Sequence, residues 1–285
     1  MQNFKIKSYC KINLFLRVIK KLSNGYHSIA SLVTFCKLHD LISISEIKYP
    51  KDKITFSGNF KNGINNKINT ITKVLSLLRK NNLIKNKYFK INIKKNIPHG
   101  SGLGGGSSNA ADLLKFFNKK LILTDEKLKK FAKQVGFDVP ISLEKENTLL
   151  IGKKDKFFKI KRRFQFDILI VYPNIICKTK KIFKKNRVSN FSKKYSFSII
   201  RDKKKLINLL ISENNDLEET VIKIYPKVGK IINFIKCQKG CYLSRITGSG
   251  SACIGIFSSK KNAILAQNII RSKYPKYWCV VSKTI

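Results

Sequence analysis

Glycine is unusually dense in the stretch IPHGSGLGGGSSNAADLL, which runs from residue 97 to 114. The residues before it alternate apolar and polar side chains, as in a strand with one wet face, and those after Asn109 have the apolar spacing of a helix. Glycine lets a backbone approach an anion closely and adopt positive φ, and a helix N-terminus supplies unpaired N–H donors and partial positive charge. A flexible linker is the alternative, but this stretch is bracketed by regular structure. It therefore indicates a phosphate-binding loop.

Two common nucleotide-binding motifs do not describe this loop. No Lys-Ser or Lys-Thr pair follows the glycines, as a Walker A loop requires. A G-x-G-x-x-G dinucleotide motif would need an early βαβ unit and an acidic residue at the end of the next strand. Here the loop begins a third of the way along the chain, and the region after it offers no such strand end.

The elements that must position the loop can be read from spacing and caps. Apolar residues recur at helical spacing over 68–82, residues 87–98 alternate as a strand, and the helix after the loop has Ser107, Ser108 or Asn109 as its expected N-cap. A second helix is expected from Thr124 to near Gly136, with acidic residues in its first turn. Further along we expect a buried strand over 166–173, a long exposed loop over 178–196, helices on both sides of Pro226, and two strands joined by a glycine turn over 241–259. A charged segment near residue 155 is a candidate boundary, so the chain reads as α+β in two domains, 1–155 and 156–285.

Composition excludes several classes of protein. A chain of 285 residues with 43% apolar residues can build a full globular core. No segment is apolar for the length of a membrane span, and the first residues lack the pattern of a signal peptide. The seven cysteines are scattered without zinc spacing, and His39 and His99 lack nearby ligand-type partners, so we expect reduced cysteines, no metal ligands, and a cytoplasmic protein without a membrane partner.

The formal net charge of +43 raises the possibility of nucleic-acid binding. However, only eight of the 59 basic residues are arginine, the better reader of phosphates and bases. The chain is also rich in Lys, Asn, Ile, Phe and Tyr, which A- and T-rich codons encode, and its lysines are spread along the whole length. We interpret the charge mainly as mutational bias and expect no specific nucleic-acid partner, although such a surface attracts phosphorylated molecules.

Several segments, in order along the chain, resemble the GHMP kinases. The segment PHGSGLGGGSSNAAD is similar to the phosphate-binding motif of that family, with Ser101 where glycine or alanine would be expected. The other segments that carry the resemblance are YCKINLFLRVIKKLSNGYHSIASLVTFCKLHD near the start, VGFDVPISL, NNDLE, and RITGSGSACIGIF. One glycine loop is weak evidence, but five ordered matches spanning residues 9 to 257 are specific.

The resemblance implies a fold and a set of roles. The implied fold has an N-terminal ribosomal-S5-like α/β domain and a C-terminal ferredoxin-like α+β domain, with the substrate in the cleft between them. Asp138 would accept the proton of the substrate hydroxyl, and Lys11 would lie beside that carboxylate and stabilise charge on the moving phosphoryl group. Taken alone, Asp138 also fits an ordinary helix N-cap, because it precedes Val139 and Pro140.

Binding residues follow from the same resemblance. The implied cofactor-binding residues, with Asn69 near the adenine and the others around the ATP phosphates, are Asn69, Gly100, Ser101, Gly102, Leu103, Gly104, Gly105, Gly106, Ser107, Ser108, Asn109, Ala110, Ala111 and Asp112. The implied substrate-binding residues are Asn13, Tyr26, His27, Phe183, Thr247, Gly248, Ser249 and Gly250. An aromatic ring and an imidazole suit a flat heterocycle, here a cytosine between Tyr26, His27 and Phe183. A plain β-turn is the alternative for the last four residues of that set.

The implied activity is ATP- and Mg²⁺-dependent phosphorylation of the 2-hydroxyl of the diphosphocytidyl derivative of methylerythritol, in isoprenoid precursor biosynthesis. The expected enzyme is a monomer or a homodimer. Two alternatives stay open at this point. A GHMP kinase with another alcohol as substrate would keep the glycine loop without needing the cytosine platform. A basic nucleic-acid-binding protein of related fold would not need Lys11 and Asp138 together, and its affinity would fall steeply with salt.

Overall fold

The computed structural model describes residues 3–23, 25, 27–152, 157–160, 164–186 and 202–285. The chain divides into two compact units, each assembled from separate segments. The first comprises residues 1–11, 38–99 and 104–145, and the second comprises 12–37, 100–103 and 146–285. Both division points near the start fall inside long strands, β1 (Asn3–Lys21) and β2 (His27–Ile47). The units therefore do not follow from one cut in the chain, and the expected domain boundary at residue 155 stays a prediction.

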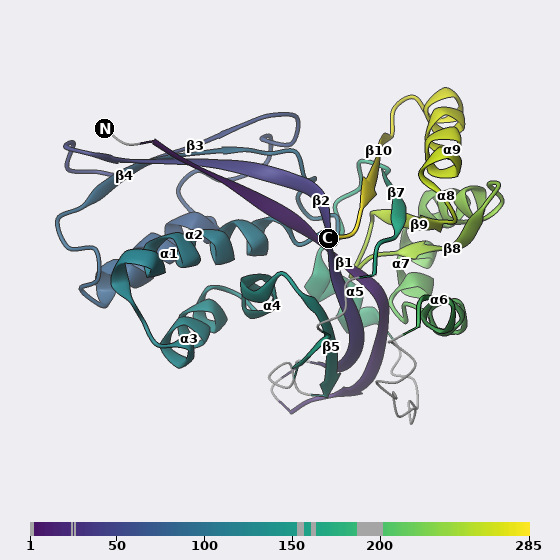
Figure 1. Cartoon of the computed structure of the whole chain (residues 1–285), viewed down its shortest axis with the longest axis horizontal. Helices are drawn as coiled ribbons and strands as arrows, with labels where there is room; N and C mark the ends of the chain where they lie inside the picture. Colours follow the sequence, from purple (N-terminus) through teal and green to yellow (C-terminus); the bar gives the residue numbers. More distant parts are fainter. Residues whose placement is uncertain (1–2, 24, 26, 153–156, 161–163, 187–201) are drawn as a thin grey trace. The chain divides into compact units, whose positions relative to one another are not determined.

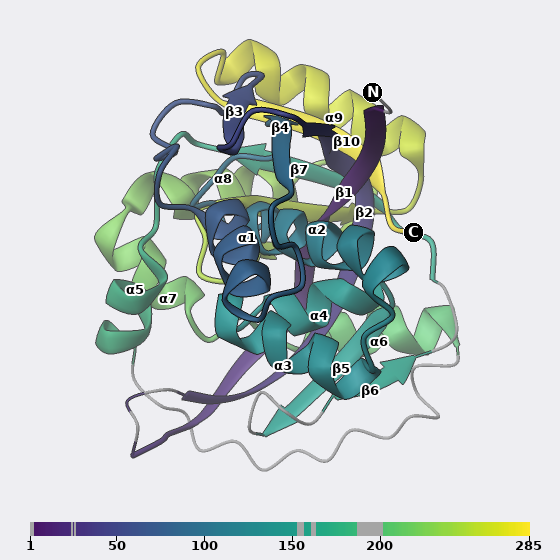
Figure 2. The same cartoon turned by 90° about the vertical axis from the view of Figure 1, so that its left-hand side faces the viewer.

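The first unit packs helices against a sheet (Figure 2). Strand β3 (Lys53–Ser57) pairs in parallel with β4 (Tyr88–Lys94), and β4 pairs antiparallel with residues 41–47 of β2. The helices are α1 (Thr70–Lys80), α2 (Gly105–Leu121), α3 (Asp125–Val135) and α4 (Val139–Glu144). The buried faces of α1, α2 and α3 meet the inward side chains of β2 and β4 in one core, which includes Leu75, Ile91, Leu114 and Phe131.

The second unit contains a four-stranded antiparallel sheet in the order β10-β7-β9-β8. Its strands are β7 (Asp167–Tyr172), β8 (Cys241–Ile246), β9 (Cys253–Phe257) and β10 (Trp278–Lys283). Helices α8 (Pro226–Lys236) and α9 (Lys260–Lys273) pack beside this sheet, as Figure 1 shows. Their apolar faces bury Ile231, Ile235, Ala266 and Ile270 against it.

The same unit includes shorter elements. Residues 29–33 of β2 pair antiparallel with β5 (Asn147–Gly152), which pairs with β6 (Phe157–Ile160). The remaining helices are α5 (Thr179–Lys185), α6 (Lys203–Ser212) and α7 (Glu218–Ile224). Within the described residues, no helix has the length and apolar content needed to cross a membrane.

Most of the elements expected from the sequence are confirmed. Helix α1, strand β4, helix α3 with its Thr124 cap, strand β7, the two helices that meet at Pro226, and the pair β8–β9 all lie where their patterns predict. Two expectations are wrong. The expected loop over 178–196 contains α5, because Ile182 is fully buried in the core of the second unit; residues 187–196 lie outside the described residues. Helix α2 begins at Gly105, earlier than the expected caps, with Gly104 at the N-cap and no side-chain cap bond.

Candidate functional site

The first part of the glycine loop, residues 100–103, lies against the glycine turn between β8 and β9 in the second unit. Gly102 has φ +85°, and a Cβ at this position would overlap the carbonyl oxygen of Thr247. The Ala252 N–H donates to the carbonyl of Ser101 at 3.0 Å. Glycine is therefore required at 102 both for the left-handed backbone and for the close approach. Two motifs that are far apart in the sequence form one packed backbone structure.

The glycine turn over residues 247–250 is held by side chains to which the sequence assigned no role. The Asn215 amide nitrogen donates to the carbonyls of Ile246 and Gly248 at 3.1 and 2.9 Å. The Glu218 carboxylate accepts from the Ile246 N–H at 2.8 Å, and burial is the main cause that raises the pKa of this carboxyl. Both residues belong to the segment NNDLE, whose resemblance to the family was the only signal that could have found them.

Some of the predicted substrate-binding residues in the second unit contact one another through hydrogen bonds. The Asn13 N–H donates to Thr247 Oγ1 at 2.9 Å, and the Asn13 amide nitrogen donates to Ser31 Oγ at 2.8 Å. Ser249 Oγ and Thr179 Oγ1 are 2.9 Å apart. Thr247 and Ser249 in the glycine turn are therefore hydrogen-bonded to Asn13 and Thr179, respectively.

The predicted aromatic platform is present for two of its three members. The His27 and Phe183 rings lie with centroids 5.2 Å apart and planes tilted by 36°. Phe183 reaches this position because α5 forms in the lysine-rich segment. Tyr26 lies outside the described residues.

The second part of the glycine loop opens helix α2 in the first unit. Gly104 is left-handed, with φ 66° and ψ 15°, and a Cβ there would lie 3.1 Å from both Cβ and Cε of Lys11. The Lys11 stem thus occupies the space that any side chain at 104 would need. The N–H groups of Gly105, Gly106 and Ser107 begin the helix without carbonyl partners four residues earlier, so they are donors for an anion.

Lys11 and Asp138 meet in the first unit. The Lys11 Nζ lies 3.6 Å from Asp138 Oδ2; the lysine side chain is 5% exposed and the aspartate side chain 40%. Asp138 stands at the N-cap position of α4, but its side chain makes no cap bond. Asp138 therefore occupies the N-cap position of α4, but its carboxylate does not cap the helix. A buried ammonium facing a half-exposed carboxylate, beside the N-terminus of α2, suits transfer of a phosphoryl group to a hydroxyl.

A chain of hydroxyls connects helix α2 to Asp138. Ser108 Oγ donates to Ser142 Oγ at 3.4 Å, and Ser142 Oγ donates to the Asp138 carbonyl at 3.1 Å. Ser108 is almost fully buried, whereas Ser107 is partly exposed. Of the two serines, Ser107 is therefore the one whose hydroxyl can reach a ligand. Ser142 was not predicted; its position in the segment VGFDVPISL is the one signal that could have found it.

A buried ion pair between Asp40 and Lys95 holds the two ends of the glycine loop. Asp40 is fully buried and pairs with Lys95, whose ammonium also donates to the Asn109 side chain at 3.0 Å. The other Asp40 oxygen accepts from the N–H groups of Asn96 and Ile97 at 2.8 and 2.9 Å. One carboxylate thus fixes both the strand end that leads into the loop and the helix that leaves it. Asn109 joins this network through its side chain, which accepts from Lys95 and donates to Asp40.

Other predicted cofactor-binding residues are engaged in contacts within the protein. The Asn69 side chain caps α1 by accepting from the Ile71 and Thr72 N–H groups, and its nitrogen donates to two nearby carbonyls. Asp112 is buried two turns into α2 and pairs with Lys145 at 2.5 Å; burial raises the pKa of its carboxyl, and Lys145 opposes that rise. Leu103, Ala110 and Ala111 are completely buried. The assignment of these residues to the ATP site stays a prediction.

Comparison with known proteins identifies the family of the chain. The family description "GHMP kinases N terminal domain" matches residues 69–146, and "GHMP kinases C terminal" matches residues 199–276. The 4-diphosphocytidyl-2-C-methyl-D-erythritol kinase of Pelagibacter ubique is 39% identical over 287 residues, covering 100% of both chains. The enzyme of that name from Wolbachia pipientis is 33% identical, covering 98% of this chain and 97% of the relative.

Solved structures show the same fold. A crystal structure of 4-(cytidine 5'-diphospho)-2C-methyl-D-erythritol kinase superposes with a TM-score of 0.77 at 22% identity, covering 99% of each chain. Homoserine kinase from Cytophaga hutchinsonii superposes with a TM-score of 0.71 at 13% identity, covering 100% of this chain and 95% of that one. The chain therefore belongs to the GHMP kinases and, within them, to the family of 4-diphosphocytidyl-2-C-methyl-D-erythritol kinases. The α+β fold and the family predicted from the sequence are confirmed.

Proposed function

We propose that the protein transfers the γ-phosphoryl group of ATP to the 2-hydroxyl of 4-diphosphocytidyl-2-C-methyl-D-erythritol, a step in the synthesis of isoprenoid precursors. The observation that carries the proposal is the Lys11 side chain, whose stem packs on Gly104 and whose ammonium faces the Asp138 carboxylate. The full-length relatives that bear this substrate in their name support the choice of alcohol.

Asp138 is the group that receives or orients the attacking hydroxyl. Its carboxylate is partly exposed, so a substrate can reach it, and its helix position is fixed by the bond from Ser142. Phosphoryl transfer passes through a loose transition state, in which positioning matters more than a strong base. Lys11, which is buried and directed at the same carboxylate, stabilises the negative charge of the transferring group.

The opening turn of α2 fits the phosphates of ATP. Its unpaired N–H groups and its partial positive charge suit an anion, and Gly104 keeps the approach free of a side chain. Bound ATP would supply the phosphoryl group, and Mg²⁺ would neutralise charge on the phosphate oxygens. Ser107 is the hydroxyl we assign to the cation or to a phosphate oxygen, since Ser108 is buried against Ser142. Mg²⁺ commonly takes few protein ligands besides phosphate and water, so one hydroxyl suffices.

The second unit contributes the residues assigned to the nucleotide half of the substrate. We assign the cytosine to the His27 and Phe183 rings, with Tyr26 as the third aromatic group. Ring contacts of this kind suit a flat heterocycle. Asn13 and the turn from Thr247 to Gly250 are assigned to the rest of the substrate. A single chain holds all these groups, and the activity requires no nucleic acid or membrane.

The test is Mg²⁺-dependent ADP release by the purified chain, with and without 4-diphosphocytidyl-2-C-methyl-D-erythritol. We expect the substrate to stimulate turnover, and we expect both Asp138→Asn and Lys11→Met to reduce kcat by at least about 100-fold. Asp125→Asn, an exposed change in the first turn of α3, is the matched control and should leave kcat within about twofold of the wild type.

Two results would contradict parts of the proposal separately. Stimulation by homoserine or mevalonate, but not by the diphosphocytidyl compound, would refute the proposed substrate. The assignment of kinase activity would still stand. Full activity of Asp138→Asn would refute the assigned role of the carboxylate and leave the substrate.

A further inference from the structure

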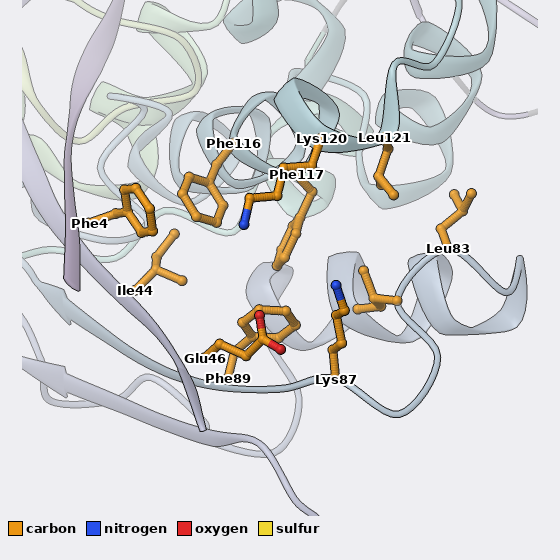
Figure 3. A pocket seen from close by; sticks show the side chains of 11 residues that line it. Phe4, Ile44, Glu46, Leu83, Lys87, Phe89, Phe116, Phe117, Lys120 and Leu121 are labelled. Carbon is orange, nitrogen blue, oxygen red and sulfur yellow. The ribbon is translucent and has the colours of Figure 1, made fainter. Parts of the chain in front are cut away.

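A cavity of about 230 Å³ lies in the first unit, near the end of α2 that is farthest from the glycine loop (Figure 3). Its walls include Phe116, Phe117 and Lys120 from the last turns of that helix, together with residues of β1, β2 and β4 and of the α1–β4 connection. Lys120 follows Gly105 by fifteen residues, which corresponds to about 22 Å along a helix. The cavity is therefore separate from the candidate phosphate site.

The floor of the cavity is aromatic. Phe4 lies edge-on to Phe116 with centroids 5.2 Å apart, and Phe89 lies edge-on to Phe117 at 4.9 Å. Phe89 and Phe117 are almost completely buried. Burial of an apolar guest against these rings removes apolar surface from water on both sides, which favours binding. The floor thus suits an alkyl chain or a small ring, and not a hydrated polar group.

The rim of the cavity is charged and has an excess of positive charge. Glu46, Lys87 and Lys120 are all exposed, and Figure 3 shows the ends of their side chains gathered over the apolar floor. None of the three forms an ion pair with another described residue. Two ammonium groups against one carboxylate, on a chain with a net charge of +43, favour an anionic head group.

We propose that this cavity binds an amphiphilic anion, with its alkyl chain on the phenylalanine floor and its head group between Lys87 and Lys120. A 150 Å³ apolar cavity holds a benzene molecule, so 230 Å³ corresponds to roughly nine carbon atoms. A fatty carboxylate and an alkyl phosphate share this chemistry. The proposal does not depend on the kinase function.

The test is isothermal titration calorimetry on the full chain with octanoate, octyl phosphate, butyrate and octanol. We expect both eight-carbon anions to bind, and the tighter of the two identifies the preferred head group. Butyrate should bind at least tenfold more weakly, because it has four fewer CH₂ groups to remove from water on the phenylalanine floor. Octanol should bind more weakly than octanoate because it lacks the charge.

Rim variants test the head-group contact. Lys120→Gln should weaken octanoate binding about two- to fivefold, the range of an exposed ion pair, and Glu46→Gln should strengthen it. Lys130→Gln, the same charge change on α3 away from the cavity, is the control and should have no effect. Absence of octanoate binding at millimolar concentration would overturn the proposal. Equal binding of butyrate, equal binding of octanol, or equal loss in Lys120→Gln and Lys130→Gln would overturn it as well.

Discussion

The glycines of the loop look alike in the sequence, but the structure predicts opposite effects for alanine at two of them. Gly104 is left-handed with φ 66°, and an added Cβ would press on the Lys11 stem at 3.1 Å. Gly106 lies in the first turn of α2, where an added Cβ would meet only the Thr70 side chain, with Oγ1 at 3.7 Å and Cγ2 at 3.9 Å, both ordinary contacts. One position resists a side chain for two independent reasons, and the other has room for it.

The expected free energies differ in sign. At Gly104 the left-handed backbone costs a residue such as alanine about 1 to 3 kcal/mol, including the tight contact with Lys11. At Gly106, alanine in a helix is favoured over glycine by about 0.5 to 1 kcal/mol. Urea unfolding followed by far-UV circular dichroism should therefore show Gly104→Ala less stable than the wild type and Gly106→Ala equally stable or more stable.

Activity gives a second measurement of the same contact. Displacement of the Lys11 stem by a few tenths of an ångström shifts its ammonium relative to Asp138, so we expect kcat of Gly104→Ala to fall about tenfold or more. If Gly104→Ala is as stable as Gly106→Ala and as active as the wild type, the described packing of Lys11 on Gly104 is refuted.

Three further predictions concern buried polar groups. Asp40→Asn leaves the Lys95 ammonium buried without its carboxylate and should cost about 3 to 5 kcal/mol in urea unfolding, whereas Glu219→Gln, which breaks an exposed pair, should cost less than about 1 kcal/mol. Asn215→Ala leaves two carbonyls of the β8–β9 turn region without their donor and should cost about 1 to 3 kcal/mol; a neutral effect would refute the clamp. Burial raises the folded-state pKa of Asp112, so the folded protein binds its proton more tightly than the unfolded chain does, and stability is lost as pH rises from the ordinary value of 3.8 through the folded-state pKa. The unfolding free energy of the wild type relative to Asp112→Asn should therefore decline as pH rises through that window, and a constant difference would contradict the raised pKa.

Local elements could be predicted from the sequence where their signals are local. Helix α1 has apolar residues on one face, and α3 has a Thr124 cap with acidic residues in its first turn. Such patterns reflect the period and the ends of a helix, which depend on neighbours within a few residues. Helix α5 could not be predicted in this way, because its lysine-rich sequence offers one buried anchor, Ile182, whose partners lie in distant segments.

The candidate site shows the same division. Lys11 and Asp138 were found through a resemblance of motifs, but their distance of 3.6 Å depends on packing across 127 positions of chain. Asn215 and Ser142, which hold the turn and Asp138, lie in the segments NNDLE and VGFDVPISL, but the resemblance of those segments did not assign them a role, because their contacts are set by packing. The structure also gives Asn69 a capping role at α1 and Asp112 an ion pair with Lys145, neither of which the motif indicated.

The sequence by itself determined the α+β class and the family, and it predicted an anion-binding loop, because periodicity, glycine density and ordered motifs are properties of the chain as written. Only the tertiary structure showed which glycines cannot be replaced. Only the tertiary structure showed that the Asp40–Lys95 ion pair holds the ends of the loop. The physical reason is that close approach, burial and ion pairing depend on distances between residues far apart in the chain, and only packing sets those distances.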